Sequence, residues 1–203
     1  NRSDLRKGNR PIMRHPIPRT VAASLFVIFV LCQPAAALDT AATLGLAGKY
    51  YDLGNYAKAQ PLYEKLVKAE GMPATILPDV YYRLGRSYHY SNQTDSAIIC
   101  FQTVSDLYPK CKIRDSARKW LGDCHVLEDR LDSAIAVYRS ILQNPSSSQV
   151  VPEVKFELAA TLFKIRDYDA AESEFKTFTS KYPSHILTKQ AKFYLKRIQN
   201  IPR

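Results

Sequence analysis

The chain has 203 residues, of which 46% are hydrophobic, and it contains only seven Gly and twelve Pro. This composition can form a hydrophobic core, and it excludes a collagen-like or low-complexity chain. The formal net charge is +10, but residues 1–37 hold six Lys/Arg and one acid, which leaves 23 bases and 18 acids, interspersed, in the remainder. Because nucleic-acid binding needs clustered Lys and Arg, no nucleic-acid partner is expected.

Residues 1–37 are expected to be an upstream extension and a signal peptide. The basic stretch "MRHPIPRT", which starts at Met13, precedes the apolar run Val21–Leu31, and the small residues of "PAAALD" follow. This order is typical of a secretory signal, and the positions of Ala35 and Ala37 predict cleavage after Ala37. The apolar run has about 11 residues, fewer than the roughly 20 of a membrane-spanning helix. We therefore expect an exported protein, in the periplasm or associated with the outer membrane.

Cys32 offers an alternative processing route, the attachment of a lipid. A lipid-attachment cysteine usually follows a small residue, whereas Leu31 precedes Cys32. Cleavage after Ala37 would release the protein into the periplasm, and lipidation would tether it to a membrane. A membrane is therefore expected as a partner only if Cys32 is lipidated.

The rest of the chain repeats itself with a period of 37 or 38 residues. Gly85 in "LGRSY" corresponds to Ala47, Gly122 and Ala159 in the other copies. Four further columns keep this spacing: Leu46, Leu84, Leu121 and Leu158; Ala59, Ala97, Ala134 and Ala171; Tyr63, Phe101, Tyr138 and Phe175; and Leu66, Val104, Ile141 and Phe178. Internal repetition at this period indicates a solenoid.

Each copy is predicted to form two helices joined by a polar turn. The apolar residues of both halves are three and four positions apart, which is helical spacing, and "SNQTD" between the halves of the second copy suits a turn and a new helix start. The small residues of the Gly85 and Ala97 columns are expected to face each other where the helices cross. A larger residue there should overpack the crossing, at a cost of roughly 1–3 kcal/mol.

These columns resemble the tetratricopeptide repeat. The second copy carries the most signature positions, with Tyr81, Leu84, Gly85, Tyr88, Ala97, Phe101, Val104 and Pro109, whereas the third has His125 where Tyr is usual. The resemblance implies an all-α, right-handed superhelical solenoid of about four helix-turn-helix repeats. They would occupy about residues 40–73, 78–111, 115–148 and 152–185 of a domain spanning 38–203. The Lys-rich segment 186–200 is expected to be a capping helix.

The linkers narrow the resemblance to a bacterial envelope subgroup. Tyr108-Pro109 and Tyr182-Pro183 each precede an Ala by eight residues. This pattern resembles the repeat domain of the Tol-Pal-associated cell-division coordinator and the repeat lipoprotein of the outer-membrane barrel assembly machine. The function implied is a non-catalytic scaffold that binds a peptide or partner protein in its concave groove. The alternative is a membrane-tethered structural subunit of an outer-membrane assembly or secretion complex.

The face of each first helix that its neighbours leave uncovered would line this groove. It comprises Leu44, Tyr51, Tyr82, Arg86, His89, Tyr90, Lys119, Asp123, Val126, Leu127, Phe156, Phe163 and Lys164. Tyr82, Arg86 and Tyr90 are four residues apart and should form one stripe. Aromatic rings with Arg are favoured at binding hot spots. We expect the partner to contact Tyr51, Tyr82, Arg86, Tyr90, Lys119, Phe156 and Phe163.

No catalytic motif is present, and no enzyme activity, cofactor or metal is expected. Cys111, Cys124 and His125 form an incomplete ligand set. An exported chain meets oxidising conditions, so Cys100 and Cys124 on stacked helices are candidates for a disulfide, with Cys111 as a rival partner for either. The alternative is that these thiols are buried and reduced.

Overall fold

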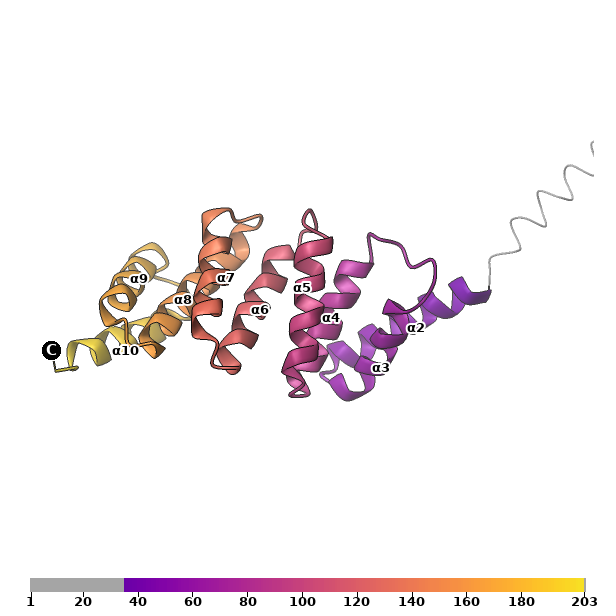
Figure 1. Ribbon diagram of the computed structural model, residues 1–203, viewed down its shortest axis with the longest axis horizontal. Coiled ribbons are helices and arrows are strands. Elements are labelled where there is room, and N and C mark those ends of the chain that lie inside the picture. The colour runs from indigo at the N-terminus through magenta and orange to yellow at the C-terminus, as the bar shows by residue number, and fades with distance from the viewer. Residues whose placement is uncertain (1–34, 203) are drawn as a thin grey trace, which may run out of the picture. The chain divides into compact units, whose positions relative to one another are not determined.

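The computed structural model describes residues 35–202, which form nine α-helices, one short 3-10 helix and no β-strand (Figure 1). The expected upstream extension, the apolar run and Cys32 lie outside the described residues. Residues 40–203 make up one compact unit. Within the described range, none of the helices combines the length and the apolar character that crossing a membrane requires.

The helices form consecutive antiparallel pairs. Their bounds are α2 (Ala35–Asp52), α3 (Tyr56–Val67), α4 (Leu77–Tyr90), α5 (Thr94–Leu107), α6 (Arg114–Leu127), α7 (Leu131–Gln143), η1 (Ser148–Val150), α8 (Val151–Lys164), α9 (Tyr168–Lys181) and α10 (Thr188–Gln199). From α3 to α10, each helix packs against the next one in the chain. The predicted all-α solenoid of helix-turn-helix repeats, with a capping helix α10, is confirmed.

Small residues lie where the two helices of each repeat cross, as predicted. A Cβ atom added to Gly85 would lie 2.8 Å from Cε1 of Phe101, and one added to Gly122 would lie 2.8 Å from Cζ of Tyr138. The facing column of Ala59, Ala97, Ala134 and Ala171 is fully buried, and so are the four aromatic residues that follow it. The crossings are therefore close-packed, with the aromatic ring of the second helix against the backbone of the first.

The leucine column is buried in three repeats and not in the first. Leu84, Leu121 and Leu158 are at most 7% exposed, whereas Leu46 is 44% exposed. Leu84 belongs to the core cluster of the first repeat, so this column packs against the preceding repeat. Within the described residues no repeat precedes α2 to cover Leu46, which explains the difference.

Every turn inside a repeat has the same backbone geometry. One residue in each turn has a φ between 56° and 70°: Gly54, Asn92, Asp129 and Arg166. The N–H of the next residue donates to the carbonyl five positions back, at 2.8–3.0 Å, in all four repeats. This arrangement satisfies a free carbonyl of the last helical turn. The left-handed residues form a further column of the repeat, which their dissimilar side chains hide in the sequence.

The linker between α7 and α8 is held by a buried carboxylate. Asp115 in the first turn of α6 is fully buried. It accepts hydrogen bonds from the backbone N–H groups of Ser146, at 2.5 Å, and Ser147, at 3.1 Å. Arg118, one turn further along α6, lies 3.9 Å from its other oxygen. Asp115 thereby ties the linker to the repeat that it leaves.

Candidate functional site

The first helices of successive repeats share one side of the stack. Besides their own partners, α4 contacts α6 and α6 contacts α8. We call the side chains that these three helices present together the inner face. It carries most of the residues that the sequence suggested for partner binding.

Arg86 on α4 is surrounded by aromatic rings. Its Cζ lies 5.0 Å from the ring centroid of Trp120, 5.4 Å from Tyr51, 5.7 Å from Tyr90 and 5.9 Å from Tyr82. We call these five residues the Arg86 cluster. Rings in these positions attract a guanidinium through their negative faces. Burial by itself would lower the pKa of Arg86, but the Tyr90 hydroxyl and the other tyrosines raise it above its ordinary value, so the group remains a cation.

Arg86 has no anionic partner, unlike the arginine one turn before it. Nη1 of Arg83 lies 3.2 Å from Oδ1 of Asp52. Arg86 donates only one long hydrogen bond, from Nη2 to the Tyr90 hydroxyl at 3.4 Å, and its Nε is buried without a partner. Among the described residues, no carboxylate forms an ion pair with it. The inner face therefore holds a half-buried cation that is free to accept an external anion.

Trp120 on α6 connects this cluster to the next repeat, and the sequence reasoning missed it. Its Nε1 donates to the Tyr82 hydroxyl at 3.1 Å, its ring stacks 6.3 Å from Phe101, and Nζ of Lys119 lies 4.9 Å above it. Helical projection favoured Lys119 over its neighbour. The sequence did contain a signal for Trp120. It is the only Trp of the chain, and Trp is enriched at binding hot spots.

Tyr56 on α3 extends the cluster outward. Its ring stacks on that of Tyr90, with centroids 4.4 Å apart and planes 18° apart. Tyr90 is 48% exposed, so this stacked pair gives the cluster an accessible aromatic rim.

Lys119, another predicted groove residue, is neutralised within its own helix. Its Nζ lies 2.8 Å from Oδ2 of Asp123, and Oδ1 of that carboxylate accepts from the Tyr138 hydroxyl at 2.7 Å. Glu157 on α8 faces this pair. Burial first, and then the charge of Asp123, raise the pKa of Glu157 to about 7, against the opposing effect of Lys119. The middle of the inner face thus carries a carboxyl group that titrates near neutral pH.

Phe163 lies apart from the Arg86 cluster, in a second aromatic group beside α10. Its ring centroid is 5.4 Å from that of Tyr168 and 5.1 Å from that of Tyr194, and Cζ of Arg197 lies 5.0 Å above it. These residues line a cavity of about 530 Å³ that also contains Glu157. The structure therefore brings the predicted groove residues together in two groups.

Two of the predicted groove residues belong to the core. Phe156 is 3% exposed, and its ring packs on Phe175, Phe178 and Tyr194. The prediction that Phe156 lines the groove is wrong, because aromatic rings of α9 and α10 cover this position. Tyr51 is 9% exposed, so it supports Arg86 from beneath and offers a partner little surface.

The three cysteines within residues 35–202 do not pair. Cys100, Cys111 and Cys124 are free thiols, and Cys100 and Cys124 belong to different core clusters, so the candidate disulfide between them is not formed. Burial raises the pKa of both buried thiols to about 12. Sγ of Cys124 lies 3.8 Å from Nδ1 of His89 on α4, and not against the adjacent His125. The described residues contain no group of three His, Cys, Asp or Glu side chains arranged to hold a metal ion.

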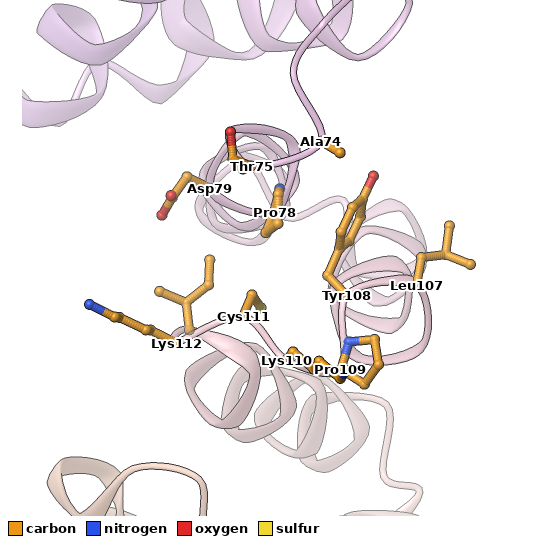
Figure 2. Close-up of a pocket in the computed structure, with 11 residues that line it drawn as sticks. Ala74, Thr75, Pro78, Asp79, Leu107, Tyr108, Pro109, Lys110, Cys111 and Lys112 are labelled. Atoms are coloured by element: carbon orange, nitrogen blue, oxygen red, sulfur yellow. The ribbon is translucent and has the colours of Figure 1, made fainter.

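A further cavity, of about 540 Å³, lies at the end of the second repeat, where α4 begins and α5 ends (Figure 2). Pro78, Tyr108 and Cys111 surround it, with Asp79 and Lys112 at its edge. The linker with Tyr108 and Pro109 forms one wall of the cavity. The charged side chains that line this cavity, Asp79, Lys110 and Lys112, are exposed to solvent. The guanidinium of Arg86 is instead half-buried among four aromatic rings, so the Arg86 cluster is the stronger candidate for partner binding.

Comparison with known proteins gives consistent matches to one kind of repeat. A sequence model of the tetratricopeptide repeat matches residues 44–110 and, overlapping them, residues 82–148. Comparison with curated protein sequences gave no match.

Three solved structures illustrate the similarity of fold. MamA of AMB-1 has a TM-score of 0.61 at 19% identity, covering 80% of this chain and 84% of its own. YrrB, described as a TPR protein with an unusual peptide-binding site, has a TM-score of 0.64 at 21% identity, covering 79% and 76%. A tetratricopeptide repeat protein from Parabacteroides merdae has a TM-score of 0.65 at 12% identity, covering 79% and 60%. At these identities the similarity is one of fold.

Proposed function

The chain belongs to the tetratricopeptide repeat family, and from this premise we propose that it is a non-catalytic scaffold that binds a peptide or partner protein on its inner face. Repeat solenoids offer extended surfaces of this kind. The peptide-binding site described for YrrB, a protein of similar fold, supports the proposal.

The observation that carries the proposal is the unpaired Arg86. A half-buried guanidinium costs free energy to desolvate, and Arg83 shows that an arginine of the same helix can obtain a carboxylate from its own chain. An extended peptide with a carboxylate side chain would supply the missing charge. Its apolar side chains would pack on Tyr82, Tyr90 and Trp120. We therefore expect the partner to present an acidic residue next to an apolar one.

We place this activity in the bacterial cell envelope. The proposal rests on the signal-like pattern of residues 13–37 and on the Tyr-Pro linkers at 108–109 and 182–183. A soluble periplasmic form would support cleavage after Ala37, and an acyl chain on Cys32 would support the tethered assembly subunit instead. Mass analysis of the protein recovered from envelope fractions distinguishes these two forms.

Binding on the inner face can be tested with peptides selected by the protein from a random display library. Trp120 is the only Trp in the chain and belongs to the Arg86 cluster, so its fluorescence reports binding in solution. We expect selected peptides to change this signal. Because a charge-assisted hydrogen bond is lost, Arg86→Ala should weaken binding by about tenfold or more.

Arg139→Ala is the matched control, because Arg139 is an exposed arginine of α7, a second helix. It should leave the affinity within about twofold of the original. If the selected peptides bind the Arg86→Ala protein as tightly as the unchanged one, the inner face is not the binding site.

A further inference from the structure

The positive charge of the folded unit is concentrated at its C-terminal end. Residues 175–203 contain seven Lys/Arg and no Asp or Glu, whereas residues 38–174 contain 16 Lys/Arg and 18 Asp/Glu. The first of these segments has a net charge of +7 and the second of −2. A surface that serves only solubility mixes both signs. The segment that contains α10 therefore has more positive charge than a capping role requires.

Helix α10 arranges this charge on one face. Lys189, Lys192 and Lys196 are spaced by three and four residues, so they lie along a single stripe of the helix, and all three are exposed. Phe193 lies between them and is 58% exposed. We call these four residues the α10 strip.

The opposite face of α10 fixes the strip in its outward orientation. Ala191 and Ile198 are buried against the last repeat, and the ring of Tyr194 stacks on Phe175 with centroids 5.0 Å apart. The strip is therefore a preformed surface on a packed helix, and binding to it requires no refolding.

The lysines of the strip have no acidic partners within the described residues. Elsewhere in the unit, Lys164 pairs with Asp129 and Lys176 pairs with Glu172. No ion pair joins the three strip lysines to a carboxylate, and Ile186, just before the helix, is 88% exposed. Unpaired lysines beside exposed apolar side chains are the pattern of a helix that lies at the interface of an anionic membrane.

We propose that the α10 strip binds the surface of a membrane that contains anionic lipids. The lysines contact the headgroups, while Phe193 and Ile186 enter the boundary with the acyl chains. The two apolar side chains favour a lipid surface over a nucleic acid, whose backbone would be contacted by the cations alone. This activity is separate from the inner face, which stays available to a protein partner.

The test is sedimentation of the full chain with vesicles of phosphatidylcholine alone and with vesicles that also contain phosphatidylglycerol. Because residues 21–31 are apolar, binding is scored as the difference between the two vesicle types. We expect binding to the anionic vesicles that weakens with added salt. The triple substitution Lys189→Glu/Lys192→Glu/Lys196→Glu should reduce binding to the anionic vesicles by about tenfold or more. The separate variant Phe193→Ser should weaken the binding that remains at high salt.

A matched triple substitution separates location from total charge. Lys68→Glu/Lys110→Glu/Lys112→Glu changes the net charge equally at exposed lysines outside α10, and it should keep binding within about threefold. Circular dichroism verifies that both variants remain folded. The proposal is overturned if both triples lose binding equally, if neither loses it, if neutral vesicles bind as well as anionic ones, or if a DNA duplex binds the strip while anionic vesicles do not.

Discussion

At the residue scale, two glycines that both lie in first helices of repeats differ in how closely other atoms pack against them. Gly48 and Gly122 both lie inside first helices of a repeat. Nothing lies within 4 Å of a Cβ atom built on Gly48, whereas one built on Gly122 meets the ring of Tyr138. The repeat thus requires a small residue at the crossing, which Ala47 provides in the first repeat, and places no such demand on the next residue, Gly48, which points about 100° further around the helix.

Substituting alanine at these two glycines should change stability in opposite directions. Gly48→Ala should raise the free energy of unfolding by about 0.5–1 kcal/mol, because Gly is a poor helix former. Gly122→Ala should lower it by roughly 1–3 kcal/mol, because the methyl group overpacks the crossing. Urea unfolding curves measure both. A stabilising Gly122→Ala would show that the helices separate easily at this point.

Arg166 occupies the left-handed position that Gly54 fills in the first repeat. A non-glycine residue pays a conformational cost there of the order of 1 kcal/mol. Arg166→Gly should therefore raise the free energy of unfolding by about 0.5–1 kcal/mol. Arg139→Gly, inside α7, should lower it by about 1 kcal/mol. Thermal melting of the two variants gives the comparison, and a fall for both would contradict the turn assignment.

The sequence allowed part of the site to be predicted at this scale. Tyr82, Arg86 and Tyr90 share a helix, so their spacing alone places them together. Trp120 joins them from another helix, through a crossing geometry that periodicity does not contain. Phe156 was misplaced for the same reason, since the aromatic rings of α9 and α10 that bury it lie in other elements.

At the scale of elements, single side chains connect a helix to the linker or the helix beside it. Asp115 of α6 holds the linker after α7 through the N–H groups of Ser146 and Ser147. Glu157 of α8 faces Lys119 and Asp123 of α6. The first contact fixes the path between two repeats, and the second couples two first helices electrostatically.

Removal of the Asp115 carboxylate should loosen that linker. Asp115→Ala leaves two N–H groups without their acceptor, which should lower the free energy of unfolding by about 2–4 kcal/mol. Hydrogen exchange at Ser146 and Ser147 should accelerate. Asp132→Ala, at an exposed aspartate in the first turn of α7, is the control and should leave these two amides as they were. Unchanged exchange in the Asp115→Ala protein would exclude the anchoring role.

Glu157 should make stability depend on pH. Its pKa is raised from 4.5 to about 7 in the folded chain, so the folded state binds the proton more tightly than the unfolded state. The stabilising effect of that proton is complete below pH ~4.5 and is lost as the pH rises through ~7. Glu157→Gln should therefore stabilise the protein at pH 8, by about 1–3 kcal/mol, and change little at pH 5.

The neighbouring Glu153 is exposed and provides the control for this pH dependence. Glu153→Gln should show nearly the same difference in stability between pH 5 and pH 8 as the unchanged protein. Denaturant unfolding at the two pH values measures each variant. A Glu157→Gln protein with no gain at pH 8 would mean that the carboxyl group is already well solvated when ionised.

At the scale of the whole molecule, the sequence predicts the fold far better than the site. The fold follows from columns that recur in four copies. Where one copy departs from the pattern, as His125 does, the equivalent residues of the other copies still assign the position to the repeat. The site has no such redundancy. Arg86 and Trp120 each occur in one repeat only, and their contact depends on how two repeats stack. The order of the helices was therefore predictable, and the unpaired charge on the inner face was not.

The shared turn geometry also bears on how this array can change its length. The left-handed residue and the hydrogen bond after it recur at equivalent positions, at Asn92 and again at Asp129. A deletion of residues 93–129 would join Asn92 to Arg130 and put α4 against α7, with Gly85 facing Tyr138 in the register that Gly122 has now. Unequal recombination at such points would shorten the array by one unit without breaking any turn, and a gene carrying this deletion should still encode a folded, shorter protein.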